Sequence, residues 1–170
     1  MESRRPATEA EARALASSVR LRILRLCLDQ ALTNKEIAGR LDANPATTLH
    51  HVRKLVDTGF LAAEPSRPGP RGSTEIPYRA TGKSWEVNVR DSGVTGGGAA
   101  MVDAFLQEVR LAGLERGEYM RLGLRLTAEG HAELFRRLQE LLDDFRYRSQ
   151  GDGEAYSLFV ALHHDVTRES

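Results

Sequence analysis

The chain has 170 residues, enough for one compact unit or for a small domain with an extension. Its apolar content of 41% permits a packed core, and no stretch approaches the roughly 20 apolar residues that span a bilayer. The charged, alanine-rich start lacks the apolar core of a secretory signal, so we expect a cytoplasmic protein.

Charge is distributed unevenly along the chain, although the formal net charge is zero. Residues 1–90 hold 15 Lys and Arg against 10 Asp and Glu, whereas residues 91–170 hold 9 against 14. A basic first half followed by an acidic second half is typical of a DNA-binding head joined to a body with another role.

The first predicted elements are two helices. An alanine- and glutamate-rich run predicts a helix from about residue 8 to 16, and Ser17 or Ser18 can cap a second helix over 19–30. The apolar residues of the second helix recur at helical spacing: Ile23, Leu24, Cys27 and Leu28. We therefore interpret Cys27, the single cysteine, as a small buried apolar residue.

The next segment predicts two short helices joined by a tight break. Thr33 and Glu36 have the spacing of a capping box, which opens a helix over 34–41. Residues 42–44 interrupt it, and Asn44 followed by Pro45 is a favourable start for a second helix. That helix extends to about residue 58, where Gly59 can end it in a left-handed turn. This arrangement is the helix-turn-helix plan.

A β-hairpin is predicted directly after this second helix. Residues 60–64 and 75–81 are candidate strands, and the segment 65–73 between them is rich in proline and glycine. A strand, a basic loop and a strand in this position constitute a wing over 61–81. Residues 82–98 are polar and end in three glycines, which indicates a linker containing the domain boundary.

The second half predicts alternating helices and strands. A helix is expected at about 99–115 and a longer one, capped by Thr127, up to about residue 147. Residues 119–126 alternate apolar and polar side chains, which predicts a strand before the long helix, and residues 155–162 are predicted as a final strand after it. Either helix can form a dimer seam or can simply cover the local core.

Helical-wheel placement of the predicted recognition helix, at about 100° per residue, separates a core face from an exposed face. The expected core face holds Leu49, Val52, Leu55 and Val56. The exposed face carries short donor side chains suited to base edges in the major groove, with cations nearer the helix end suited to phosphate. The wing arginines would contact phosphate or the minor groove. The candidate DNA-contact residues are Lys35, Thr47, His50, His51, Arg53 (at the edge of the exposed face), Lys54, Arg67, Arg71 and Arg79.

Four stretches of the sequence resemble the winged-helix repressors of the ArsR type. Residues 18–24 are similar to the start of that family's second helix, and residues 32–38 to its Leu-Thr-x-x-Glu-Leu-Ala segment. Residues 48–55 are similar to its recognition helix, with His51 at the family's histidine, and Gly59-Phe60-Leu61 matches its lead into the wing. The resemblance implies a homodimer that represses a promoter until an effector releases it.

The sequence also departs from this family. The helix 34–41 lacks the cysteines through which well-known members sense metals, and His163-His164 would point to opposite faces of a strand. We therefore expect no metal site and no other cofactor. No phosphate-binding loop, nucleophile motif or zinc-protease motif occurs, so we expect no catalytic residues and no enzymatic activity.

These patterns together predict a mainly α fold with a small β wing. We expect a winged helix-turn-helix domain at 7–85, a linker at 86–98, and a dimerisation segment at 99–170 of helical or α+β structure. The part from 120 to 162 could be an added dimer element or a pocket for a small organic effector. The expected partners are operator DNA and a second copy of the chain. The alternative hypothesis is a winged helix that contacts a protein and not DNA.

Overall fold

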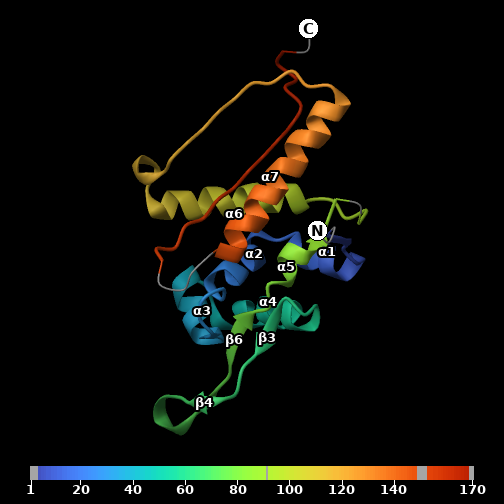
Figure 1. The fold of residues 1–170 in the computed structure, drawn as a ribbon. Helices are drawn as coiled ribbons and strands as arrows, with labels where there is room; N and C mark the ends of the chain where they lie inside the picture. Colours follow the sequence, from blue (N-terminus) through green and yellow to red (C-terminus); the bar gives the residue numbers. More distant parts are fainter. Residues whose placement is uncertain (1–3, 91, 149–152, 169–170) are drawn as a thin grey trace. The chain divides into compact units, whose positions relative to one another are not determined.

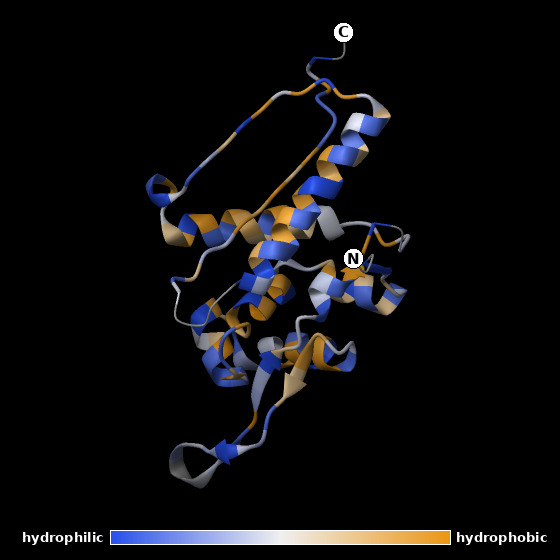
Figure 2. Cartoon of the chain, viewed as in Figure 1, coloured by the Kyte–Doolittle hydropathy of each residue, from blue (hydrophilic) through white to orange (hydrophobic). Residues whose placement is uncertain are grey.

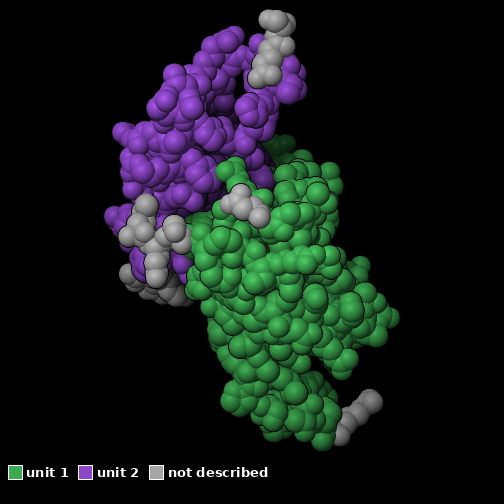
Figure 3. Space-filling view, turned by 90° about the vertical axis from the view of Figure 1, so that its right-hand side faces the viewer, with its two compact units in different colours: residues 1–116 green, residues 117–170 purple. Residues whose placement is uncertain are grey.

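The computed structural model describes residues 4–90, 92–148 and 153–168. Its chain divides into two compact units, Met1–Arg116 and Gly117–Ser170 (Figure 3). The first unit contains the helix-turn-helix and its wing, together with the helix predicted to follow the linker. The second contains the long C-terminal helix between two extended segments.

The helices of the first unit correspond closely to those predicted, except that a short helix, α5, lies at 83–86, where a linker was expected (Figure 1). The second helix ends earlier than residue 30, at Leu26, because the chain turns there toward the first strand of the sheet. The bounds of the helices are α1 Glu9–Leu15, α2 Ser18–Leu26, α3 Asn34–Leu41, α4 Pro45–Asp57, α5 Lys83–Glu86 and α6 Gly97–Ala112.

Local capping explains where the helices of the helix-turn-helix begin. The Thr33 hydroxyl accepts from the Glu36 amide at 3.2 Å, and the Glu36 carboxylate accepts from the Thr33 amide at 2.7 Å. This is the predicted capping box, and Thr8 and Glu11 form a second one at the start of α1. Between α3 and α4, Asp42 takes a left-handed backbone conformation with φ of 51°, which a short polar side chain tolerates.

The end of α4 is closed by a Schellman motif. Gly59 has φ of 74°, its amide donates to the carbonyl of Val56 at 2.9 Å, and the Phe60 amide donates to the carbonyl of Leu55 at 2.8 Å. The prediction that Gly59 ends this helix is confirmed. The motif turns Phe60 inward, where only 1% of it is exposed, and directs the chain into the wing.

Among the described residues, three small sheets accompany the helices. An antiparallel sheet has the order β2-β6-β3, with β2 at Leu32–Thr33, β6 at Pro77–Ala80 and β3 at Leu61–Ala63. The tip of the wing is a second ladder between β4 (Arg67–Pro68) and β5 (Thr74–Glu75), joined by the short 3-10 helix η1 (Pro70–Gly72). Finally, β1 (Arg5–Pro6) pairs in parallel with β7 (Val87–Asn88).

The core of the first unit lies where α1, α2, α3 and α4 meet the sheet. Its fully buried side chains include Ile23, Cys27, Ile37, Val52, Leu55 and Phe60. Cys27 is therefore the buried residue that was predicted, and its burial raises the pKa of the thiol to about 11.

The segment expected as a linker, 86–98, leads into α6. Val87 is buried, because β7 pairs with β1, and α6 then begins at Gly97. Helix α6 packs on α2, where Arg22 donates to the Gln107 side-chain oxygen at 2.9 Å and Arg25 pairs with Glu108 at 3.9 Å. The short 3-10 helix η2 (Leu114–Arg116) ends this unit.

The second unit consists of α7 (Ala128–Arg148) and extended chain on each side of it. The Thr127 hydroxyl accepts from the Gly130 amide at 3.1 Å, as predicted for the start of this helix. The predicted strands at 119–126 and 155–162 are wrong for the single chain: both segments are extended, but neither belongs to a sheet within the described residues. Alternation specifies which faces a strand would bury, but a ladder also requires a neighbouring strand in register.

The predicted fold class is confirmed, with a winged helix-turn-helix followed by a C-terminal segment. Within the described ranges, no helix has the length and apolar character needed to cross a membrane.

Candidate nucleic-acid interface

The first turns of α3 and α4 are held together by a side chain that the sequence analysis did not single out. Asn34, the first residue of α3, donates from its amide nitrogen to the carbonyl of Pro45 at 2.9 Å. Asn44 caps α4 through its side-chain oxygen, which accepts from the Ala46 amide at 2.8 Å. Lys35 is exposed beside this junction, so its ammonium lies on the surface where the two helices start.

Helix α4 is rotated relative to the helical-wheel prediction. The buried residues are Thr48, Val52 and Leu55, whereas Leu49 and Val56 are only half-buried. Thr48 can be buried because its hydroxyl donates to the Asn44 carbonyl at 3.0 Å and so needs no water. This internal hydrogen bond is the physical reason that a polar residue replaces Leu49 at the centre of the core face.

The rotation changes which residues dominate the exposed face. Thr47, His50 and Arg53 are exposed, and Lys54 is half-exposed. Arg53, expected at the edge, is therefore part of the exposed face, together with Ala46 and His50. A helix of this length, about 20 Å, presents these donors along a strip that fits the major groove.

His51 occupies a different environment from its neighbour His50. It is half-buried, and its Nδ1 lies 3.5 Å from a guanidinium nitrogen of Arg20 on α2. Burial lowers the pKa of His51, and the positive charge of Arg20 lowers it further. Arg20 itself is anchored by donating to the carbonyls of Ala14 and Arg13, at 2.5 and 2.7 Å. His51 is thus a half-buried side chain that links α4 to α2.

The cations of the helix-turn-helix differ from those of the wing in their pairing. Among the described residues, the side chains of Lys35, Arg53 and Lys54 make no ion pair and no hydrogen bond. Their charges are available to an external anion. Arg67 and Arg79 of the wing, by contrast, are engaged by carboxylates of the same chain.

Arg67, in β4, pairs with Glu36 at the start of α3 at 2.7 Å. Both side chains are close to half exposed, so the pair contributes little stability, below about 1 kcal/mol, and opens readily. Glu36 is also the capping residue of α3, and the backbone amide of Thr33 is the main cause of its lowered pKa. The contact holds the wing against the helix-turn-helix across 31 residues of sequence.

Arg79 pairs with Glu64 and also donates to the carbonyl of Asp29 at 3.0 Å. It braces the base of the wing against the loop after α2, and its exposed position still allows a contact to phosphate. Arg71 lies in η1, but its side chain is outside the described part of the molecule.

An open cleft of about 290 Å³ lies between the start of α3 and the wing strands. Thr33, Asn34 and Lys35 line one side, and residues of β5 and β6 line the other. The sequence gives no local signal for this cleft, nor for the contacts of Asn34 with Pro45, Glu36 with Arg67 and Arg20 with His51, because each joins different elements of the fold.

Comparison with protein families finds one described as a "Helix-turn-helix domain", which matches residues 15–63. The matched segment runs from the end of α1 to β3, less than a third of the chain, and includes the whole of α3 and α4. Residues 15–63 are thus similar to a helix-turn-helix domain, which supports a role in DNA binding.

A search of curated proteins found no match. Among solved structures, the chain is similar to a mutant of ZitR from Lactococcus lactis in apo form, at 21% identity and a TM-score of 0.36. That alignment covers 76% of this chain and 83% of the other. A second structure of the same mutant has 21% identity and a TM-score of 0.35, covering 76% and 75% of the two chains.

Proposed function

We propose that this protein is a homodimeric, sequence-specific transcriptional regulator of the ArsR type that represses a promoter and is released from it by a small organic effector. In this proposal residues 7–85 bind operator DNA and residues 99–170 provide dimerisation and effector binding. Residues 86–98 are the linker between these two parts. The observation that carries the DNA-binding part is the set of ion-pair-free cations Lys35, Arg53 and Lys54 around exposed Thr47 and His50.

The proposed roles follow from the position of each side chain. Thr47 and His50 lie in the first two turns of α4, and they are short enough to read base edges in the major groove. Lys35, Arg53 and Lys54 contact phosphate, and so do the wing residues Arg67, Arg71 and Arg79 once the wing reaches the duplex. His51 acts through Arg20 and sets the position of α4.

Fluorescence anisotropy with the DNA upstream of the gene, compared with scrambled DNA, tests this proposal. The three unpaired cations Lys35, Arg53 and Lys54 from each of two protomers give a slope of log affinity against log salt of about −5, and contacts from the wing arginines make it steeper. Raising the salt from about 50 to 200 mM should then weaken binding at least roughly a thousandfold. No binding to either DNA at low salt would refute the proposal and favour a protein-contact role for the winged helix.

Substitutions separate the two kinds of contact. Arg53→Ala and Lys54→Ala should weaken binding to both DNAs equally and reduce the salt slope by about 2 each, because each substitution removes one phosphate contact from both protomers. Thr47→Ala and His50→Ala should instead reduce the preference for upstream over scrambled DNA, by about 1–3 kcal/mol for each specific contact. Arg13→Ala removes an exposed cation of α1 that is paired with Glu9, and it is the matched control with unchanged affinity. Equal loss of preference from all of the α4 variants would contradict the assignment.

A further inference from the structure

The second unit has an unusual property for folded chain: none of its described residues, 117–148 and 153–168, is buried. Fixing a residue in one conformation costs roughly 1–2 kcal/mol of backbone entropy, which burial must offset. The helix α7 and its flanking segments therefore need a further surface to cover them.

The exposed apolar area is of the size of an interface. Tyr119, Phe145, Tyr147 and Tyr156 are 58%, 61%, 86% and 83% exposed, and four aromatic rings at these fractions expose roughly 600 Å². Aliphatic residues of the unit, including Met120 at 99% and Leu122 at 78%, raise this to roughly 1,000 Å². A stable interface buries about 800 Å² on each partner, whereas the largest apolar patch of a typical monomer is about 300–600 Å².

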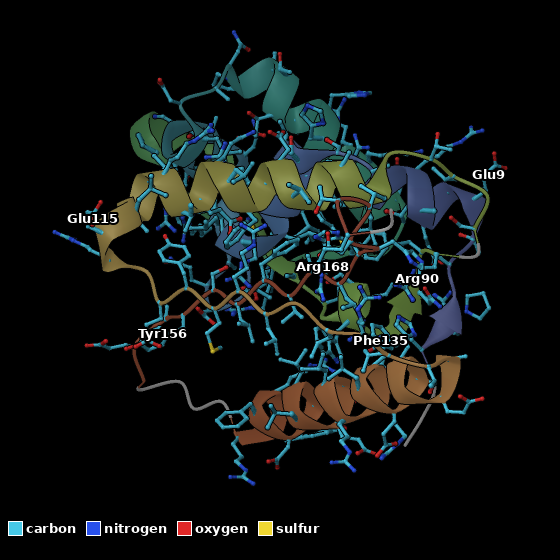
Figure 4. The ribbon with its side chains drawn as sticks, turned by 90° about the horizontal axis from the view of Figure 1, so that it is seen from above. Glu9, Arg90, Glu115, Phe135, Tyr156 and Arg168 are labelled. Carbon is cyan, nitrogen blue, oxygen red and sulfur yellow. The ribbon has the colours of Figure 1, made fainter. Side chains whose placement is uncertain are left out.

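The two extended segments have the pattern of strands that lack a sheet. In 119–126 the apolar side chains are Met120, Leu122, Leu124 and Leu126, and all are exposed. Segment 155–162 is apolar nearly throughout, and Tyr156, Leu158, Val160 and Leu162, which would share one face of a strand, are all exposed. Figure 2 shows hydrophobic colour along both segments, and in Figure 4 Phe135 lies on the side of α7 that faces them.

The described part of the first unit offers no strand of matching length for these segments. Its longest strand is β6, Pro77–Ala80, and β2 and β3 already pair with its two edges. The strands at the edges of that sheet, β2 and β3, are shorter still. A second copy of the chain, in contrast, supplies segments of matching length.

The charges select which segments meet. Segment 119–126 carries Arg121 and Arg125 and no acidic residue, so two copies paired antiparallel about Gly123 would set these arginines opposite each other. Segment 155–162 carries no Lys, Arg, Asp or Glu, so pairing 119–126 with it avoids like charges. The polar face of α7 is already satisfied by its own ion pairs, such as Arg136 with Glu140 at 2.7 Å.

We infer that the C-terminal unit is completed by a second copy of the chain, with 119–126 of one protomer forming a strand against 155–162 of the other. The inference rests on the proposed homodimer and assigns its surface. It places that surface outside α6, whose own exposed apolar residues Met101, Val102 and Leu106 offer the competing seam.

The test measures the mass of the full chain by light scattering after gel filtration, without DNA. We expect twice 18.8 kDa for the wild type. Met120→Glu with Leu122→Glu should give a mass of 18.8 kDa. The dissociation constant of the dimer should rise at least about 100-fold, because the two carboxylates place charge in the interface. Met120 and Leu122 are the most exposed apolar side chains of this segment, so replacing them should disturb the fold of the single chain least. Arg121→Gln with Arg125→Gln changes the charge equally on the other face and should leave the dimer intact.

Hydrogen exchange gives a second readout. The amides of 119–126 should be protected in the dimer and exchange fast after dilution to monomer, while those of α2 and α4 stay protected throughout. Fast exchange of 119–126 in a stable dimer would overturn the inference.

Further outcomes separate the inference from the proposed function. A dimer that survives Met120→Glu with Leu122→Glu but is lost with Val102→Glu and Leu106→Glu would place the seam on α6 and refute the inference alone. A wild type that is monomeric throughout would refute the proposed dimer as well. DNA binding is scored separately by anisotropy.

Discussion

The buried carboxylate of Glu11 holds the N-terminal arm (residues 4–8, which contain β1) in place, and Glu11→Gln is the most informative single substitution. Its side chain is 7% exposed and accepts two hydrogen bonds from Arg5, at 2.7 and 2.9 Å. It also pairs with Lys83 at 2.7 Å and accepts from the amide of Thr8 at 2.8 Å. These contacts join the arm and α1 to α5, beyond the wing, across more than seventy residues of sequence.

The expected loss follows from the burial of the carboxylate and its partners. Glutamine keeps an acceptor for the Thr8 amide but loses the charge that holds Arg5 and Lys83. Breaking a buried ion pair costs about 3–5 kcal/mol. Arg5 is half exposed, so the lower end applies, about 3 kcal/mol of unfolding free energy. For a chain of this size that corresponds to a fall in melting temperature of about 6–12 °C.

Trp85, the only tryptophan, reports on this region through its fluorescence because it lies in α5 beneath the guanidinium of Arg4. Urea unfolding followed at Trp85 should give the free energy change. Glu9→Gln is the matched control: it makes the same change two residues away, where Glu9 is exposed (Figure 4) and its pair with Arg13 contributes less than about 1 kcal/mol.

The acid dependence has a definite sign. Hydrogen bonding from Arg5 holds the pKa of Glu11 well below its usual range. The carboxylate therefore stabilises the fold above the unfolded pKa of about 4.3, and this stabilisation is lost as the pH falls below it. The difference between wild type and Glu11→Gln should be full at pH 7 and shrink below pH 4. Equal losses from Glu11→Gln and Glu9→Gln, or a difference independent of pH, would refute this reasoning.

Three further predictions concern single residues of the first unit. Gly59→Ala should lower the free energy of unfolding by about 1–2 kcal/mol, because φ is 74° there and Lys83 Nζ lies 3.2 Å from an added Cβ. Gly39→Ala, in α3 with open space around it, should raise it by about 0.5–1 kcal/mol; urea midpoints that move in the same direction would contradict both. His51 should titrate with a pKa below the ordinary value of about 6.5 in an NMR pH series, because it is half-buried and lies beside Arg20, and a pKa at or above that value would contradict this environment. Cys27, with a pKa of about 11, should react with iodoacetamide at pH 8 at least roughly 100-fold more slowly than in unfolded chain, and similar rates would show that it is exposed.

Local interactions made part of this structure predictable from sequence. The capping box of Thr33 and Glu36, the Asn44-Pro45 start and the Gly59 stop each act within a few residues. Their energies are therefore present in any chain with that sequence, and they delimit α3 and α4 before any packing occurs. The wing followed from the same logic, because prolines and glycines exclude a helix between its strands.

Only the tertiary structure decided how α4 is oriented and which cations remain without partners. Thr48 is buried because its hydroxyl donates a hydrogen bond to a carbonyl of the same helix. His51 turns toward Arg20, and a helical wheel does not predict this contact because Arg20 lies 31 residues away in the sequence. The pairing of Arg67 with Glu36 likewise depends on the folded wing. Hydrophobic periodicity measures which side of an element avoids water, but it does not contain the identity of the group on the opposite surface. That group is supplied by chain distant in sequence, and for 119–126 we propose that a second molecule supplies it.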